Sequence, residues 1–166
     1  MMLDKLKKMF QSQVNPAMII CSPVNGKIVP ISDVSDPTFA EETLGKSIAI
    51  LPQANRVVSP VNATVEVMFD TGHAVSIVSD EGAEILIHIG IDTFQLNGQF
   101  FKAHVKNGDK VKKGDVLVEF DEAQIKAAGY DTVIPIVICN SANYTRIECT
   151  QAGPVKELEQ LIILHK

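Results

Sequence analysis

Short β-branched segments, each ended by glycine, proline, asparagine or aspartate, follow one another through most of this chain. Segments of this length between turn residues are typical of β-strands. The candidate strands are Lys27–Ile31, Thr64–Phe69, Ala74–Val78, Glu84–Gly90, Val116–Glu119 and Val133–Cys139, together with about the last five residues of the chain. No long helical period competes with them in this stretch, so we predict an all-β chain.

One short helix and one internal repeat complete this pattern. Asp121 can cap the first turn of a helix over Asp121–Gly129, and Gly129 can end it in the left-handed conformation. The tetrapeptide SPVN at Ser22–Asn25 recurs at Ser59–Asn62, and each copy leads into a candidate strand. We favour a duplicated β-unit, which would form two similar halves of one sandwich, over a coincidence of four residues.

Length and composition limit the classes of protein that fit. The 166 residues are 46% hydrophobic, enough to bury the core of one domain, which we expect over residues 18–166. A net charge of −5 argues against a nucleic-acid partner, which would need a basic surface. The longest apolar run falls well short of the roughly 20 residues of a membrane span. Three cysteines without a CxxC pair favour a reducing, cytoplasmic location.

The first ten residues, MMLDKLKKMF, place Leu3, Leu6 and Phe10 on one helical face. Residues 1–17 are therefore interpreted as a flexible amphipathic leader. A helix of this kind could rest weakly on an anionic membrane surface through residues 1–10. A helix of fewer than three turns is marginal in water, so a frayed terminus without that role is the alternative.

Two of the four histidines, His73 and His88, lie in neighbouring candidate strands joined by the turn sequence Ser79-Asp80-Glu81-Gly82. A loop of two or four residues would place the two imidazoles directly opposite each other on one face, with Cβ atoms about 4.5–5.5 Å apart. A three-residue loop would send them to opposite faces. The sequence does not decide between these loops. We predict that the rings lie on one face, and this prediction assumes a loop of two or four residues.

The even loop would surround the histidine pair with Val75, Ile77 and Leu86 on the face away from the core. Apolar groups around two reactive rings on a surface indicate that a partner docks there. Two imidazoles could act as acid and base, could carry and stabilise a phosphoryl group, or could share a zinc ion with a carboxylate from a partner. No metal or other cofactor is required. The residues assigned to the core face are Ala74, Ser76, Val78, Ala83, Ile85 and Ile87.

Three stretches of the sequence together match a known family: TGHA, EILIHIGIDT and KNGDKVKKGDVLVEFD. They closely resemble the glucose-type enzyme IIA components (glucose/β-glucoside superfamily) of the bacterial phosphoenolpyruvate-dependent sugar phosphotransferase system, from about Ile19 to Leu164. The stretch around the third motif is most similar to the IIA domains of β-glucoside permeases, whereas Met2–Phe10 is similar to the leader of free-standing glucose IIA proteins. The resemblance implies an antiparallel β-sandwich with a duplicated hybrid motif and one or two short helices.

The resemblance also implies a phosphotransferase component that works through a phosphohistidine. His88 would accept the phosphoryl group on Nε2 from the phosphocarrier HPr and pass it to a cysteine of a IIB domain. His73 would stabilise the phosphoryl oxygens, and Thr71 would hydrogen-bond near the pair and fix a ring tautomer. The carbonyl of Gly90, two residues past His88, could accept the Nδ1 proton and leave Nε2 free as the nucleophile.

The surface on which these partners dock is implied in the same way. Asp36 and Asp92 match acidic positions that face the arginines of HPr. The sequence departs from the family at Pro37-Thr38, where many members carry two apolar residues, and this difference could weaken partner binding. The apolar residues assigned to partner binding are Phe39, Phe69, Val75 and Leu86.

Other classes of protein fit the sequence less well. A zinc endopeptidase of the lysostaphin type would need an H-x-x-x-D pair and an H-x-H, but Ile77 stands four residues after His73, and Ile89-Gly90 follows His88. A biotinyl or lipoyl carrier would need a modifiable lysine, commonly within MKM, which the sequence lacks. A regulatory module that binds other proteins overlaps with the phosphocarrier and is the main alternative.

Overall fold

The computed structural model describes residues 17–166, and antiparallel strands dominate this part of the chain. Two short α-helices occur within it, α2 (Pro37–Ala40) and α3 (Glu122–Ala127), with 3-10 turns η1 (Ile31–Asp33), η2 (Thr93–Leu96) and η3 (Ser141–Asn143). The prediction of an all-β antiparallel fold with one or two short helices is confirmed. The strands are β1 (Met18–Cys21), β2 (Gly26–Val29), β3 (Lys46–Pro52), β4 (Arg56–Val58), β5 (Ala63–Met68), β6 (Ala74–Ser79), β7 (Glu84–His88), β8 (Phe101–Ala103), β9 (Lys110–Val111), β10 (Val116–Phe120), β11 (Ile134–Ile138), β12 (Arg146–Cys149), β13 (Gly153–Val155) and β14 (Gln160–His165).

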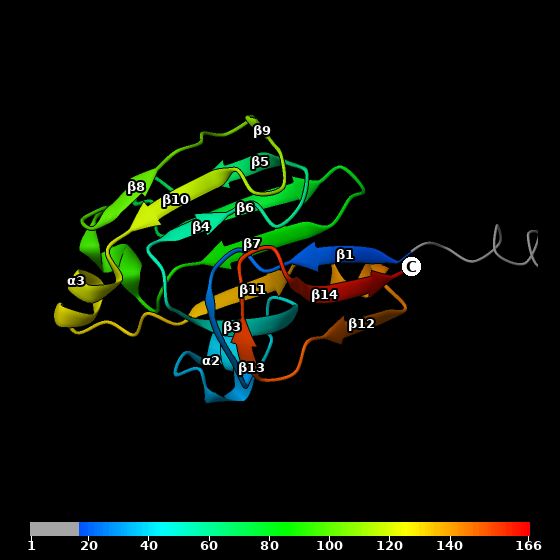
Figure 1. The fold of residues 1–166 in the computed structure, drawn as a ribbon, viewed down its shortest axis with the longest axis horizontal. Helices are drawn as coiled ribbons and strands as arrows, with labels where there is room; N and C mark the ends of the chain where they lie inside the picture. Colours follow the sequence, from blue (N-terminus) through cyan, green and yellow to red (C-terminus); the bar gives the residue numbers. More distant parts are fainter. Residues whose placement is uncertain (1–16) are drawn as a thin grey trace, which may run out of the picture.

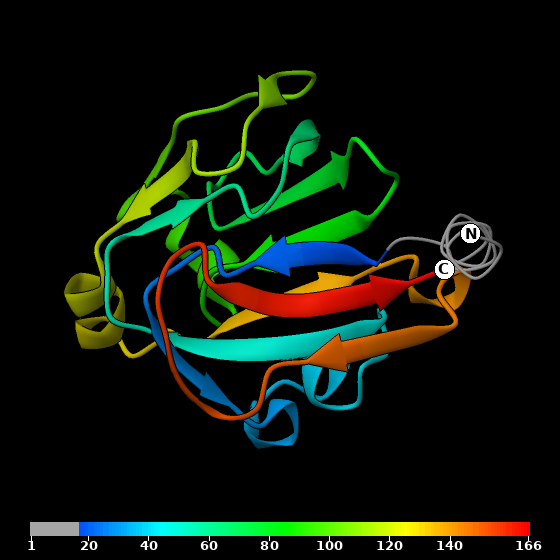
Figure 2. The same cartoon turned by 45° about the vertical axis from the view of Figure 1, so that its right-hand side comes forward.

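The strands form one long sheet and two short ones. The long sheet has eight strands in the order β13-β2-β3-β11-β7-β6-β5-β9, and the short sheets have the orders β1-β14-β12 and β4-β10-β8. Figures 1 and 2 show β1 and β14 in front of the middle of the long sheet, and β4 and β10 in front of another part of it. The two short sheets thus form the second layer of a sandwich.

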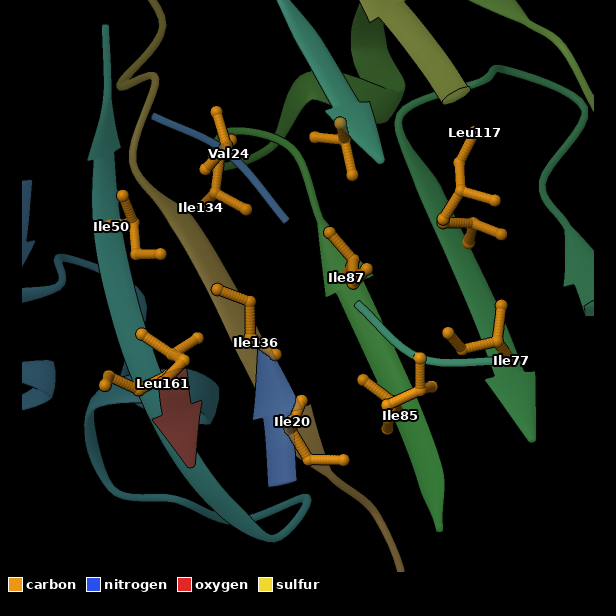
Figure 3. Close-up of a cluster of buried hydrophobic side chains, with 14 of the residues drawn as sticks. Ile20, Val24, Ile50, Ile77, Ile85, Ile87, Leu117, Ile134, Ile136 and Leu161 are labelled. Carbon is orange, nitrogen blue, oxygen red and sulfur yellow. The ribbon is translucent and has the colours of Figure 1, made fainter. Parts of the chain in front are cut away.

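One apolar core joins these layers. Figure 3 shows Ile85 and Ile87 of β7 in the same cluster as Ile20 of β1, Leu161 of β14 and Leu117 of β10. All five side chains are at most 1% exposed. Burying an aliphatic side chain of this size contributes about 1.5–3 kcal/mol, so this shared cluster holds both short sheets onto the long one.

The repeated SPVN tetrapeptide forms the same turn twice. The hydroxyl of Ser22 donates to the Val24 carbonyl at 2.8 Å, and the hydroxyl of Ser59 donates to the Val61 carbonyl at 2.6 Å. The two turns also bind each other through backbone hydrogen bonds. These cross-turn bonds run from the N–H of Val58 to the carbonyl of Pro23 and from the N–H of Cys21 to the carbonyl of Pro60. The repeat therefore forms two equivalent turns that contact each other, and the duplicated β-unit stays a prediction.

All of the predicted strands are present, most with bounds shifted by one or two residues. The helix α3 also begins as expected, because the carboxylate of Asp121 accepts a hydrogen bond from the N–H of Gln124 at 3.1 Å. Gly129 follows it with a φ of 95°. The strand β3 and the helix α2 were not predicted, although β3 lies between β2 and β11 inside the long sheet.

The predicted leader lies, except for its last residue, outside the described residues. Within residues 17–166, no helix combines the length and the apolar character that crossing a bilayer requires. The thiols of Cys21, Cys139 and Cys149 are free.

Candidate active site

The hairpin of β6 and β7 has a register that differs from the predicted one. Ala74 pairs with His88, and the N–H of Ser79 donates to the Ala83 carbonyl at 2.8 Å, which leaves three residues in the loop. Gly82, the last of these three, adopts a φ of 100°, which suits the left-handed position of a three-residue hairpin loop. The prediction of an even loop is therefore wrong.

The one-residue change of register reverses the faces of β6. Val75 and Ile77 point into the core and are 0% exposed, whereas Ser76 and Val78 lie on the opposite face and are partly exposed. Ala74, buried outside the main core cluster, shares that second face. The assignment of Val75 to the partner-binding surface is wrong, because its side chain has no exposed area. The strand β7 keeps its predicted core residues Ile85 and Ile87, since only one strand shifts.

The two histidine rings nevertheless lie together. Their centroids are 4.9 Å apart, and their planes form an angle of 80°. His73 comes before the first residue of β6 and directly after Gly72, which has a φ of 71°. The alternation of side chains holds only within an extended strand, so it does not fix the direction of His73. The expectation that a three-residue loop would separate the histidines is therefore also wrong.

The ring of His88 is held by a backbone carbonyl and an aromatic side chain. Its Nδ1 lies 2.6 Å from the carbonyl oxygen of Gly90. Because a carbonyl can only accept, Nδ1 carries the proton and Nε2 keeps a free lone pair. Phe39, from α2, packs against the ring with a centroid distance of 5.0 Å. Since Phe39 is only 5% exposed, it supports His88 from inside and offers little surface to a partner.

Nδ1 of His73 has a different partner from Nδ1 of His88. The hydroxyl of Thr71 contacts Nδ1 of His73. A hydroxyl can donate to this nitrogen, and the proton of the neutral ring then resides on Nε2. The arrangement thus allows His88 to present a lone pair and His73 to present an N–H.

Two exposed aromatic rings border His73. Phe69 packs edge-on against it at a centroid distance of 5.5 Å, and Phe94 lies at 6.3 Å. They are 40% and 50% exposed, and Leu86 is partly buried on the same strand as His88. Phe94 is not among the residues predicted from the sequence. The only signal for it was its position directly after the IGIDT end of the second matched motif.

Burial keeps both imidazoles neutral. Loss of hydration, with a smaller contribution from His88, lowers the pKa of His73 from 6.5 to about 4. Burial also lowers the pKa of His88, although its hydrogen bond to Gly90 and the carboxylates of Asp36 and Asp92 act in the opposite direction. Both rings are therefore predominantly uncharged at pH 7.

The two acidic residues predicted to face HPr lie near His88 for separate local reasons. Asp36 is the N-cap of α2, where its carboxylate accepts from the N–H of Thr38 at 2.9 Å. Pro37 occupies the first turn of that helix, where its missing N–H costs no hydrogen bond. The Pro37-Thr38 departure thus suits the start of α2. Asp92 is exposed, and it precedes η2 with a left-handed φ of 59°.

Within residues 17–166, no group of three or more histidine, cysteine, aspartate or glutamate side chains could hold a metal ion. The histidine pair supplies two nitrogens, so a zinc ion shared with a partner carboxylate stays a prediction.

Comparisons with known proteins show the family to which the chain belongs. A family model described as phosphoenolpyruvate-dependent sugar phosphotransferase system, EIIA 1, matches residues 18–144. The chain is 49% identical over 146 residues to the PTS system beta-glucoside-specific EIIBCA component of Bacillus subtilis (strain 168), covering 88% of this chain and 24% of that protein. It is 40% identical over 144 residues to the PTS system glucose-specific EIIA component of Oceanobacillus iheyensis, covering 87% of each.

Among solved structures, the glucose permease IIA from Mycoplasma capricolum superimposes with a TM-score of 0.82 and 33% sequence identity. The match covers 90% of this chain and 96% of that one. The chain thus spans about a quarter of the length of its EIIBCA relative, but most of the length of the separate EIIA proteins.

Proposed function

Since this chain belongs to the EIIA 1 family of the phosphoenolpyruvate-dependent sugar phosphotransferase system, and is thus a phosphocarrier for sugar uptake, we propose that His88 carries the phosphoryl group and that His73 stabilises it. The observation that carries this assignment is the difference between their Nδ1 partners. His88 meets the carbonyl of Gly90, whereas His73 meets the hydroxyl of Thr71. The first partner frees a nucleophile, and the second allows a donor.

The phosphoryl group arrives by nucleophilic attack. Nε2 of His88 attacks the phosphorus of the group carried by HPr. A P–N bond to Nε2 forms while the bond to HPr breaks, and HPr keeps the electron pair of that bond. The His88 ring becomes more positive as its lone pair is shared, and the carbonyl of Gly90 stabilises the proton on Nδ1.

The phosphoryl group leaves by the same kind of step. A cysteine thiolate of a IIB domain attacks the phosphorus, so a P–S bond forms and the P–N bond breaks. The electron pair returns to Nε2 of His88, which keeps its Nδ1 proton throughout. In both steps the N–H of His73 donates to the phosphoryl oxygens, where the charge of the transition state lies.

The docking surface for both partners comprises the exposed groups around the histidine pair. The EIIA family implies HPr and IIB as partners. We assign the polar contacts to Asp36 and Asp92, which would meet basic groups of HPr. The apolar contacts are assigned to the partly exposed side chains Phe69, Leu86 and Phe94.

Two further predictions depend on this function. Residues 18–166 would act as one IIA unit, and that unit would work in the cytoplasm, where free thiols such as those of Cys21, Cys139 and Cys149 stay reduced. The sugar is set by the membrane components that receive the phosphoryl group, and the relatives include both glucose-specific and beta-glucoside-specific proteins.

The test compares two substitutions with purified HPr, enzyme I, labelled phosphoenolpyruvate and a matching IIB domain. His88→Gln should not become labelled, because an amide is not a usable nucleophile. His73→Gln should still accept label but pass it on more slowly, by about 10²–10³-fold, because an amide cannot take up a proton in response to the phosphoryl charge. His104→Gln is the control, since that ring lies outside the site and pairs with Glu119 at 3.2 Å.

Label on His88→Gln in an acid-labile, base-stable form would show that another residue is the nucleophile. Normal rates of both steps in His73→Gln would reduce His73 to a structural residue and remove the paired-imidazole mechanism.

A further inference from the structure

The Gly90 carbonyl that holds the Nδ1 proton of His88 belongs to a turn with fixed peptide groups. The N–H of Gly90 donates to the carbonyl of Val133 at 3.0 Å, and the N–H of Ile91 donates to the carbonyl of Asp131 at 2.9 Å. The second of these N–H groups shares a peptide plane with the Gly90 carbonyl. Residues 131 and 133 therefore help to set the direction in which that carbonyl points.

Thr93 fixes the preceding peptide plane. Its hydroxyl donates to the carbonyl of Ile89 at 2.5 Å, and its side chain is 0% exposed. The carbonyl of Ile89 and the N–H of Gly90 are the two ends of one peptide group. Thr93 therefore holds one end of this group, and Val133 holds the other.

The methyl group of Thr93 also packs against the turn. A Cβ placed on Gly90 would lie 2.5 Å from Cγ2 of Thr93 and 2.9 Å from the carbonyl oxygen of Asp131. Gly90 has a φ of 80°, a conformation that glycine adopts without a steric penalty. Thr93 thus touches the turn with both its hydroxyl and its methyl group.

We propose that Thr93 is a positioning residue that selects the tautomer of His88. The inference rests on the proposed function, in which Nε2 of His88 must carry a lone pair. Without the hydroxyl of Thr93, the peptide group between Ile89 and Gly90 is held at one end only, by Val133, and a small rotation of it turns the Gly90 carbonyl off the line of the Nδ1–H bond. The ring is then free to place its proton on Nε2, and in that form Nε2 cannot attack phosphorus.

The test uses Thr93→Val, which removes the hydroxyl and nearly preserves the shape. The ¹⁵N chemical shifts of His88 in histidine-labelled, unphosphorylated protein report the tautomer directly, without HPr. We expect the form protonated on Nδ1 to dominate in the wild type and to become a minority in Thr93→Val. The rate of phosphorylation by HPr should fall by roughly tenfold, which is the size of effect expected when one buried hydrogen bond is lost.

Thr93→Ser keeps the hydroxyl and should restore both the tautomer and the rate to within about twofold of the wild type. Thr150→Val is the matched control, since the hydroxyl of this threonine also donates to a backbone carbonyl, that of Leu161 at 2.9 Å, and touches neither the turn nor residues 131–133. It should leave the tautomer of His88 unchanged. If Thr93→Val fails to fold, Thr93→Ala compared with Thr93→Ser tests the same hydroxyl with smaller side chains.

An unchanged tautomer in Thr93→Val would overturn the proposal, and so would a shifted tautomer in Thr150→Val. Failure of the proposed function gives a different result. If His88→Gln still accepted the phosphoryl group while Thr93→Val shifted the tautomer, Thr93 would remain the positioning residue of a ring that is not the nucleophile.

Discussion

Acidification should destabilise the fold through the buried imidazole of His73. This side chain is 6% exposed, and burial together with the nearby His88 lowers its pKa from 6.5 to about 4. Between these two pH values the unfolded chain binds a proton on this ring and the folded chain does not. The stability that the neutral ring contributes is therefore complete above pH 6.5 and is lost as the pH falls towards 4.

The size of this effect follows from the same two values. Each pH unit between 6.5 and about 4 corresponds to about 1.4 kcal/mol of unfolding free energy, so the full loss is about 3 kcal/mol. At pH 4.5 the loss should reach about 2.5 kcal/mol, because the folded ring is only beginning to titrate there. This is a large part of the stability of a typical domain.

Urea unfolding of the wild type and of His73→Gln at several pH values from 7 to 4.5 measures this loss. Glutamine does not titrate, so the wild-type value minus the variant value cancels the groups that behave alike in both proteins. This difference should fall by about 2.5 kcal/mol over the range. His104→Gln controls for the loss of an imidazole outside the site.

A difference that stayed constant to within about 0.5 kcal/mol would refute the argument that burial keeps His73 neutral. Removing His73 also changes the surroundings of His88, so the pKa of His73 should be measured independently. An NMR titration of its ring protons in the wild type should give a value near 4.

Three further predictions concern packing and docking. Gly90→Ala should lower the unfolding free energy by about 3 kcal/mol or more, whereas Gly82→Ala should lower it by only about 1–2 kcal/mol, because both glycines have a positive φ but only Gly90 is crowded. Equal melting temperatures of the two variants would contradict this prediction. Val75→Ala should lower the free energy of unfolding by denaturant by about 2 kcal/mol and leave the rate of phosphoryl transfer from HPr per folded molecule unchanged. Slower transfer by a variant of unchanged stability would place Val75 on the docking surface after all. Phe69→Ala and Phe94→Ala should change stability little, since both are exposed, but should raise the KM for HPr by roughly tenfold; an unchanged KM would exclude them from the interface.

The strands that could be predicted from the sequence are those with clear local signals. The strands β6 and β7 combine β-branched residues with flanking turn residues, and α3 has a capping aspartate and a terminal glycine. The strand β3 was missed because Ser47, Ile48, Ala49 and Ile50 are all buried, so it shows no alternation of apolar and polar residues. An apolar run of this length does not by itself distinguish a strand from a buried helix.

The sequence indicated that His73 and His88 belong to neighbouring segments, but it did not fix the register of the strands around them. The pairing of β6 with β7 depends on whether Gly82 closes a three-residue loop with a φ of 100°, and the turn sequence is compatible with other loops. The position of His73 depends on the left-handed conformation of Gly72, just before the strand begins. The alternation of side chains between two faces applies only within a strand, so it does not predict the direction of His73. The buried contact of Thr93 with the Ile89 carbonyl carried no sequence signal at all, because threonine is common in turns and strands alike.

The low pKa of His73 has a consequence for the proposed transfer, because the ring must be neutral at rest and able to take up a proton when the phosphoryl group arrives. Protonating a ring with a pKa of about 4 at pH 7 costs about 4 kcal/mol. At a separation near the 4.9 Å between the two ring centroids and an effective dielectric constant of about 20, each negative charge on the phosphoryl group contributes about 3 kcal/mol. A phosphoryl group with a charge of about −1.5 to −2 therefore supplies about 5–7 kcal/mol, which exceeds the cost. The geometry of the pair thus allows His73 to become cationic only while His88 is phosphorylated, so the resting site keeps the negative charge of Asp36 and Asp92 available for HPr.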